Sequence, residues 1–455
     1  MYLRGNKWSM TQRPKRRSSP WRIVFLLGLI GVALYFNQVV VPTTPPLFIS
    51  TPTPTRSPES FISDAEQFYN EGKLTQSIEA YRKAILADPN NPSLYVTLAR
   101  IQVFASEYED AVTNAQNALL KNPNNPMAQA VYGWALSFTD DNLAAEAAVK
   151  KAIELDPNNA LAHAYLAEIL LNSGNLENFD AAAAASRRAK DLDPNLLEVH
   201  RARGLVLLNG GPDNLEEAVQ ELKAAIAVND KIADIHLNLG FAYRLKGEND
   251  LAVDELLAAY ALNPKDPSIP TEISFAYANE GQFGKAAQYA EDAVKIAPTN
   301  PKPHGYLGIM YYRNGELDKA IQELSLAIRG GTTADGAVVE GLPLDYGKVA
   351  EYYWFYGFAL AKSNRCGEAV PVFQALLSVV PDDQLAVDNA IAGLEICLVS
   401  IETPTPEITP TPGDHGTKPG RETPKLPPDQ IGFQHLSLPA VGGFDPGRYV
   451  DLARL

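Results

Sequence analysis

The apolar and polar positions between Lys231 and Pro264 follow the pattern of a helical hairpin. One apolar stripe at helical spacing runs through Leu239, a second runs through Leu256, and Gly247 marks the turn between them. A proline ends the second helix because it cannot continue the backbone hydrogen bonding. A single hairpin cannot bury both of its apolar stripes, so this segment predicts further hairpins packed on either side.

The same pattern recurs along most of the chain. The residue that ends each hairpin recurs at Pro89, Pro123, Pro157, Pro194, Asp230, Pro264, Pro298, Thr332 and Pro381. Five of the eight steps are 34 residues long, and the steps of 37, 36 and 49 residues locate insertions. These insertions are expected near residues 175–180, near 210–214 and at 330–346. The longest has two interpretations, an irregular functional element or a tolerated surface loop.

A small residue tracks the same period on the first helix, at Ala65, Ala99, Gly133, Ala167, Gly204, Gly240, Ser274, Gly308 and Gly357. Period and motif together resemble the tetratricopeptide repeat family over roughly residues 59–400. The resemblance implies an all-α fold, a right-handed superhelical solenoid of about nine helix hairpins. The segment after Pro381 has no partner helix and is expected to cap the array.

A membrane anchor is predicted ahead of the array. Residues 1–22 are basic, and residues 23–41 run nineteen positions without a charge. At about 1.5 Å per residue, a helix of that length approaches the thickness of a bilayer core, about 30 Å. A cleaved signal peptide is the alternative, but no clear cleavage site follows. The basic flank predicts a cytoplasmic N-terminus and an extracytoplasmic array in the cell membrane.

Two segments rich in Pro and Thr flank the array and are expected to be linkers. They cover residues 42–58 and 401–430, and neither has the apolar content of a core. Residues 431–455 differ from the second linker because apolar side chains return there. This tail is either a docking peptide, for another protein or for the array itself, or a disordered end.

Charge and motifs disfavour several classes of function. The formal net charge is −15, and the first 41 residues contribute seven Lys or Arg and no acid, so residues 42–455 carry −22. Nucleic acid is therefore not an expected partner of the array. No phosphate-binding, hydrolase or metalloprotease motif occurs, and we expect neither enzymatic activity, catalytic residues, bound metal nor cofactor. His163, His200, His236 and His304 share one repeat position, which favours a packing role.

In the family that the chain resembles, three positions of each first helix line the concave face. Those positions and their neighbours are aromatic, apolar or Arg in much of this chain, which favours a peptide groove. Some of these side chains could instead complete the packing between repeats. The candidate groove residues are Arg100, Trp134, Arg201, Leu237, Phe241, Arg244, Phe275, Ile309, Tyr312, Trp354 and Phe358.

The two cysteines, Cys366 and Cys397, are predicted to form a disulfide. They lie at equal distances from the Pro381 corner, so two antiparallel helices would bring them level with each other. Two separate buried thiols are the alternative. An exported chain would meet an environment in which disulfides persist.

These features together favour a membrane-anchored extracytoplasmic scaffold that binds a protein or peptide in its groove, in cell-envelope assembly or the organisation of a complex. A surface spacer with little specific binding is the alternative. The pattern leaves the partner and the oligomeric state open.

Overall fold

The computed structural model describes residues 19–35, 38, 56–139, 141–173 and 175–402. The chain divides into two compact units, residues 1–56 and 57–455. The first contains α1, a helix of 16 residues from Pro20 to Tyr35. Among the described residues, no helix combines the length and apolar character that crossing a membrane requires. The span predicted over residues 23–41 is thus not confirmed, and 36–37 and 39–41 lie outside the described residues.

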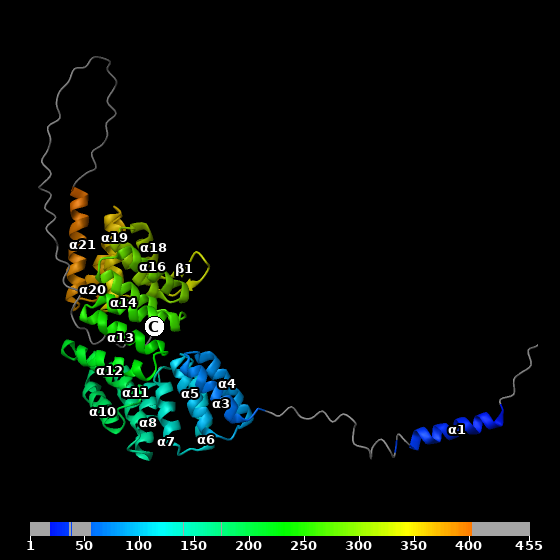
Figure 1. Ribbon diagram of the computed structural model, residues 1–455. Helices are drawn as coiled ribbons and strands as arrows, with labels where there is room; N and C mark the ends of the chain where they lie inside the picture. Colours follow the sequence, from blue (N-terminus) through cyan, green and yellow to red (C-terminus); the bar gives the residue numbers. More distant parts are fainter. Residues whose placement is uncertain (1–18, 36–37, 39–55, 140, 174, 403–455) are drawn as a thin grey trace, which may run out of the picture. The chain divides into compact units, whose positions relative to one another are not determined.

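The described part of the second unit consists mainly of helices that pack as consecutive pairs (Figure 1). The first five pairs are α3 (Pro58–Asn70) with α4 (Leu74–Ala87), α5 (Pro92–Phe104) with α6 (Tyr108–Lys121), α7 (Pro126–Leu136) with α8 (Asn142–Leu155), α9 (Ala160–Asn172) with α10 (Phe179–Leu192), and α11 (Leu197–Asn209) with α12 (Leu215–Val228). The next four are α13 (Ala233–Lys246) with α14 (Asn249–Leu262), α15 (Ser268–Asn279) with α16 (Phe283–Ile296), α17 (Pro301–Arg313) with α18 (Leu317–Arg329), and α19 (Lys348–Lys362) with α20 (Cys366–Val379).

An asparagine in the corner between two pairs caps the helix that follows it, as the sequence predicts. The Asn91 side chain accepts a hydrogen bond from the Ser93 N–H at 3.1 Å, and Asn125 accepts from the N–H groups of Met127 and Ala128. Proline takes the first helical position after each of these asparagines. The cap satisfies backbone donors at the helix start, and the missing proline N–H costs nothing there.

The recurring small residue lets the two helices of a pair approach closely. A Cβ added at Gly133 on α7 would lie 2.6 Å from the Ala145 carbonyl oxygen and 2.5 Å from Cγ2 of Val149, both on α8. Such distances are shorter than van der Waals contact, so only glycine fits at this point of the pair. The hydrophobic core then continues from pair to pair, in one cluster from Val96 to Ala276 and another from Ala286 to Cys397.

The three insertions fall where the period of the sequence places them. Short 3-10 helices occupy the first two, η2 (Leu176–Asn178) and η3 (Pro212–Asn214). The third contains an antiparallel pair of strands, β1 (Gly331–Thr332) and β2 (Val338–Val339). This loop folds back on its neighbours: the Leu342 N–H donates to the Ala327 carbonyl at 2.8 Å, and Val339 is buried.

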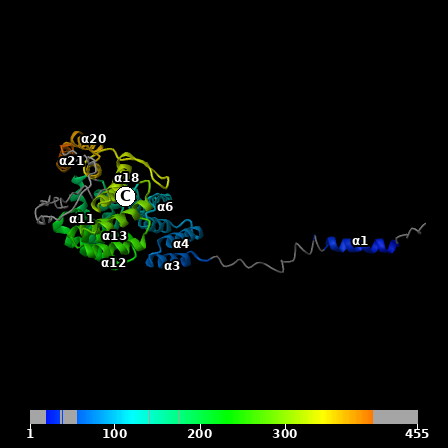
Figure 2. The ribbon, with the colours of Figure 1, turned by 90° about the horizontal axis from the view of Figure 1, so that it is seen from above.

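The array ends in a single helix, α21 (Gln384–Glu402), which packs against α19 and α20. Viewed along the perpendicular direction in Figure 2, α20 and α21 again lie side by side. The capping helix predicted after Pro381 is therefore present. Residues 403–455, which include nearly all of the second linker and the whole tail, lie outside the described residues.

Candidate functional site

A cavity of about 570 Å³ opens on the inner face of the array. The first helices α7, α9, α11, α13 and α15 contribute to its wall, together with the end of α5 and the corner before α15. Aromatic side chains line it beside carboxylates and amides, and the main lining residues are Phe104, Tyr108, Trp134, Phe138, Glu168, Asn172, Arg201, Leu205, Asn209, Asp234, Leu237, Asn238, Phe241, Asp266 and Glu272.

Contacts between distant repeats bring the N-terminal end of the array against its middle. Arg100 on α5 pairs with Glu198 on α11, 98 positions further along, and its Nε donates to Oε1 of Glu198 at 3.1 Å. The backbone at Gly72 lies against the side chain of Lys231, since a Cβ added at Gly72 would be 2.8 Å from Cβ of Lys231. The inner face therefore curves until repeats one and two touch repeats five and six.

A chain of charged side chains crosses the cavity wall from α7 to α13. Trp134 donates its Nε1 hydrogen to Oε2 of Glu168 at 2.7 Å. Arg201 forms ion pairs with both Glu168 and Asp234, and its guanidinium carbon lies 5.8 Å from the centre of the Trp134 ring. Burial raises the pKa of Glu168 above its ordinary value, although Arg201 and Trp134 oppose the shift. The guanidinium thus holds three helices together.

A second ion pair continues this chain toward α15. Arg244 donates to Glu272 at 2.8 Å, and the carboxylate of Glu272 is almost fully buried. The Arg244 guanidinium also lies 4.8 Å from the ring centre of Phe241 and 5.5 Å from that of Phe275. Cation–π contact of this kind fixes the long side chain in place.

The structure distributes the predicted groove residues over different environments. Trp134, Arg201, Leu237 and Phe241 line the cavity, while Arg100 and Arg244 form the ion pairs beside it. Leu237 is half-buried, whereas Trp134 has no exposed surface. Trp134 stacks on Tyr165 with 4.4 Å between ring centres, so its ring completes the packing between repeats and only borders the cavity.

The other five predicted residues, Phe275, Ile309, Tyr312, Trp354 and Phe358, do not line this cavity; they belong to, or pack against, the C-terminal core cluster. Ile309 and Trp354 are buried, and Tyr312 packs against Phe358 with 6.4 Å between ring centres. Their surroundings favour the alternative that they complete inter-repeat packing.

Sequence reasoning missed the acidic part of the cavity. Asp234 lies in the first turn of α13, three residues before Leu237, so it shares the stripe of the groove residues but precedes the positions expected to line the groove. Asp266 lies in the corner before α15. Tyr108 enters from a second helix, at the start of α6. Glu168 occupies the same repeat position as Trp134 and is buried. A charged residue at that position was the signal that could have identified it as part of the site.

Of the four histidines that share a repeat position, His163, His236 and His304 contact the corner before their helix, whereas His200 contacts Glu221. Nε2 of His236 lies 3.0 Å from the Asp230 carbonyl oxygen and Nδ1 lies 2.7 Å from Oε2 of Glu255, and His304 repeats this geometry with Pro298 and Glu323. Burial alone would lower the pKa of His236, but these hydrogen bonds raise it above its ordinary value. Within the described residues, no cluster of His, Cys, Asp or Glu could hold a metal ion.

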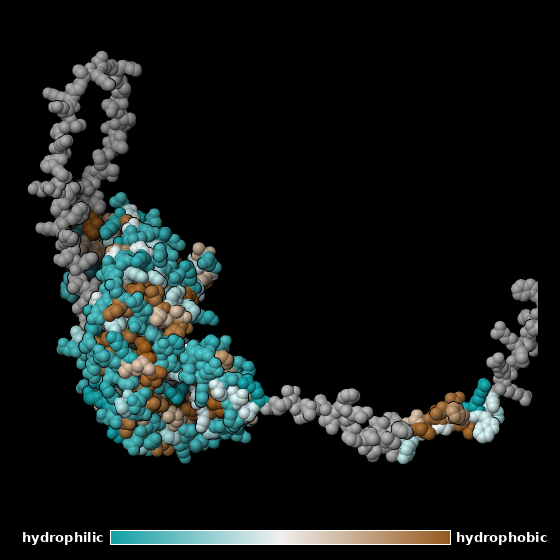
Figure 3. All heavy atoms as spheres, in the orientation of Figure 1, coloured by the Kyte–Doolittle hydropathy of each residue, from teal (hydrophilic) through white to brown (hydrophobic). Residues whose placement is uncertain are grey.

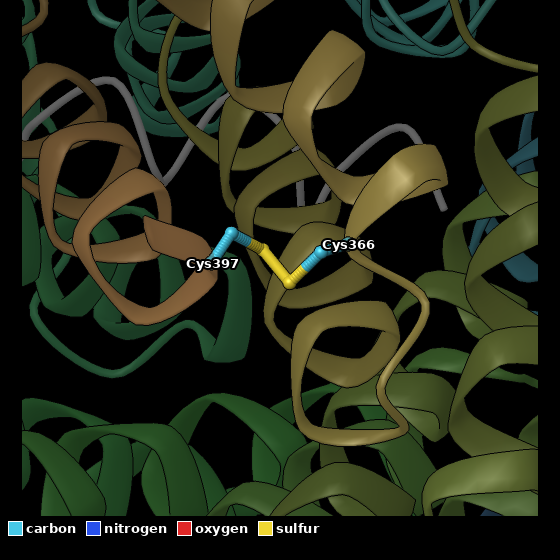
Figure 4. Close-up of a disulfide and its surroundings, with 2 residues drawn as sticks. All are labelled: Cys366 and Cys397. Atoms are coloured by element: carbon cyan, nitrogen blue, oxygen red, sulfur yellow. A yellow bond between two sulfur atoms is a disulfide. The ribbon is translucent and has the colours of Figure 1, made fainter. Parts of the chain in front are cut away.

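Cys366 and Cys397 form a disulfide between the start of α20 and the middle of α21 (Figure 4). Their Cα atoms are 5.4 Å apart, within the range that a disulfide spans. Cys397 is almost fully buried. The bond ties the capping helix to the last pair.

Paired helices stacked about a curved inner face define a helical repeat solenoid. Models of one family, the tetratricopeptide repeat, match residues 68–135 and 277–331, and further models with the same description match 128–159, 148–178 and 213–267. These matches and the fold support the tetratricopeptide repeat family for the array. Such repeats generally mediate protein–protein interactions and are typically non-enzymatic.

Solved structures of low sequence identity share this fold. The Cut9–Hcn1 hetero-tetramer of APC/C aligns with 14% identity and a TM-score of 0.51, covering 82% of this chain and 82% of that chain. A human IFIT1 dimer with m7Gppp-AAAA aligns with 19% identity and a TM-score of 0.50, covering 75% and 82%. A comparison with curated proteins finds no match.

Proposed function

We propose that this chain is a membrane-anchored, extracytoplasmic scaffold that binds a segment of a protein partner in the cavity of its inner face. The observation that carries the proposal is the cavity itself, with aromatic side chains and amides beside carboxylates. Apolar surface supplies the affinity of such a site, and a few polar groups fix the orientation of the bound segment. Amides such as Asn209 and Asn238 can bond to the backbone of an extended peptide.

Three features support the proposed location. Seven basic residues precede the uncharged stretch 23–41, an arrangement typical of an anchor with a cytoplasmic N-terminus. The disulfide suits an oxidising compartment. The Pro- and Thr-rich segment 42–58, between the uncharged stretch and the array, would hold the array away from the membrane surface. We place the role in the assembly or organisation of cell-envelope complexes.

The charge of the cavity disfavours RNA as its ligand, although the similar IFIT1 structure carries m7Gppp-AAAA. Five carboxylates line the cavity against two cationic side chains, and phosphates would be repelled. The face of the array in Figure 3 is mainly hydrophilic, with apolar side chains gathered in separate patches.

Site-specific photo-crosslinking tests the proposal. A benzoylphenylalanine placed at Asn209, in the cavity, should cross-link one defined peptide of a membrane-associated partner, identified at peptide level by mass spectrometry. Leu205→Trp fills the cavity and should reduce this product about tenfold. The matched change Leu120→Trp lies on a side chain that is 81% exposed and should leave it unchanged.

The spacer alternative makes the opposite prediction. A crosslinker at Asn209 would then give no more product than one at Leu120, and Leu205→Trp would change nothing. That result would overturn the proposed binding function.

A further inference from the structure

The ionic groups of the cavity are unbalanced. Its lining includes the carboxylates of Glu107, Glu168, Asp234, Asp266 and Glu272, and the cationic side chains of Arg201 and Lys265. Arg201 serves two of the carboxylates at once. From outside the lining, Arg244 reaches Glu272 and Arg82 reaches Glu107, the latter at 3.7 Å. Lys265 is exposed and forms no ion pair within the described residues. The negative charge therefore exceeds what the cavity's own cations neutralise.

Asp266 is the carboxylate with the least compensation. Its Oδ1 accepts from the N–H and hydroxyl of Ser268, at 2.9 and 2.6 Å, and no described cation pairs with it. Burial raises the pKa of Asp266, and the nearby charge of Asp234 raises it further. A cation placed beside the two aspartates would lower this pKa and so oppose both effects.

Glu168 supplies a second, independent sign of an open position. Its side chain is 2% exposed and lines the same cavity. Oε2 is bonded to Trp134 and Arg201, but Oε1 is buried and accepts no hydrogen bond from any described residue. A buried carboxylate oxygen without a donor is costly, so the negative charge of this wall is under-compensated and a cationic ligand beside it would be favourable.

The wall facing these carboxylates is aromatic. Tyr108 and Phe138 stack with 4.6 Å between ring centres and both line the cavity. Tyr108, Asp234 and Asp266 line the same cavity. Burial raises the pKa of the Tyr108 hydroxyl, and the charges of the two aspartates add to the shift. An aromatic ring beside carboxylates suits a cation that carries N–H donors.

We propose that the corner of the cavity between Asp234, Asp266 and Tyr108 holds a basic side chain, arginine or lysine, of the bound segment. The proposal rests on the proposed function and specifies the chemistry of its ligand. An apolar ligand would leave Asp266 uncompensated in a site closed to water, and an acidic one would be repelled. The carboxylates therefore select for a basic residue, and the aromatic lining holds its apolar neighbours.

A random heptapeptide phage library panned against the full-length chain, with Leu205→Trp as the counter-selection, tests both levels of the argument. The expected result is a set of peptides that bind the native chain, fail on Leu205→Trp and share an Arg or Lys next to apolar residues. The best peptide is then synthesised with arginine and with citrulline, which keeps the shape of arginine and removes its charge. Replacing arginine by citrulline should weaken binding about ten- to hundredfold.

Asp266→Asn identifies the partner of that charge. Its amide oxygen can still accept both Ser268 bonds, so the corner keeps its hydrogen bonding. On this variant the arginine and citrulline peptides should bind within about twofold of each other. Asp250→Asn, an exposed carboxylate on α14, should preserve the full difference.

The outcomes separate the two proposals. Two results would overturn the basic-residue proposal and leave the binding function standing. One is a set of peptides that bind only the open cavity but carry no basic residue. The other is an affinity difference between the arginine and citrulline peptides that persists in Asp266→Asn. A library that yields no peptide distinguishing the native chain from Leu205→Trp would overturn both.

Discussion

Replacing Gly133 by alanine sets helix propensity against packing. In the interior of a helix, alanine is favoured over glycine by about 1 kcal/mol. At Gly133, however, the new methyl group would lie 2.6 Å from the carbonyl oxygen of Ala145 and 3.1 Å from the backbone N of Val149. These are backbone atoms, so no side-chain rotation relieves the contact, and α7 and α8 must separate.

Overpacking of this kind costs about 1–3 kcal/mol, and the backbone contacts place Gly133→Ala near the upper end. Subtracting the gain in propensity leaves an expected net destabilisation of about 2 kcal/mol. Gly367→Ala is the matched control, because Gly367 is also helical and an added Cβ meets nothing within 4 Å. Because Gly367 lies in the first turn of α20, the control should stabilise by at most about 0.5 kcal/mol.

Urea denaturation of the two variants and the native chain, followed by circular dichroism, measures both shifts. Amide hydrogen exchange should show faster opening of α7 and α8 in Gly133→Ala. If both glycine variants moved the midpoint in the same direction, close helix approach would not be the reason for glycine at this position.

Two further predictions concern stability. Reduction of the Cys366–Cys397 disulfide opens a loop of 31 residues and should lower the stability of the last helix pair by about 4 kcal/mol, as measured by hydrogen exchange in α20 and α21. Alkylation of the denatured, unreduced protein from cells should label neither cysteine. Two labelled thiols would contradict the disulfide and would also count against an extracytoplasmic array. Burial opposes the charged form of His236 and His304, but hydrogen bonds to Glu255 and Glu323 raise their pKa values in the folded chain. The protonated histidines therefore stabilise the fold fully below about pH 6.5, the pKa of an unfolded histidine, and this stabilisation is lost as pH rises through the higher pKa values of the folded state. In the double variant His236→Gln and His304→Gln, the urea denaturation midpoint should fall less steeply with rising pH than in the native chain. An unchanged slope would contradict this role of the two histidines.

The local structure of the repeats follows from sequence because each signal acts within a few residues. Asn91 and Asn125 cap the helices that follow them, and the three changes of period mark the insertions. Sequence does not separate groove residues from residues that pack between repeats. Positions one residue apart on a helix differ by about 100°, so a residue on the inner face is next to the interface with the following repeat. Trp134 and Ile309 are buried in that interface.

The shape of the cavity could not be predicted from the period alone. Small rotations between successive helix pairs accumulate over several repeats, and the sequence motif does not specify them. The pairing of Arg100 with Glu198 depends on that sum. The same holds for the presence of Tyr108 and Asp234 in one cavity, because each lies in the first turn of an ordinary helix.

The contacts of Gly72 with Lys231 and of Arg100 with Glu198 change how the array should unfold. In an open solenoid each repeat contacts only its neighbours, and stability is close to a sum of nearest-neighbour terms. Here the first two repeats also contact the fifth and sixth, so their stabilities are coupled. Losing α3 and α4 would remove the contact of Gly72 with Lys231, and truncation from the N-terminus would therefore destabilise the middle of the chain before its C-terminal end.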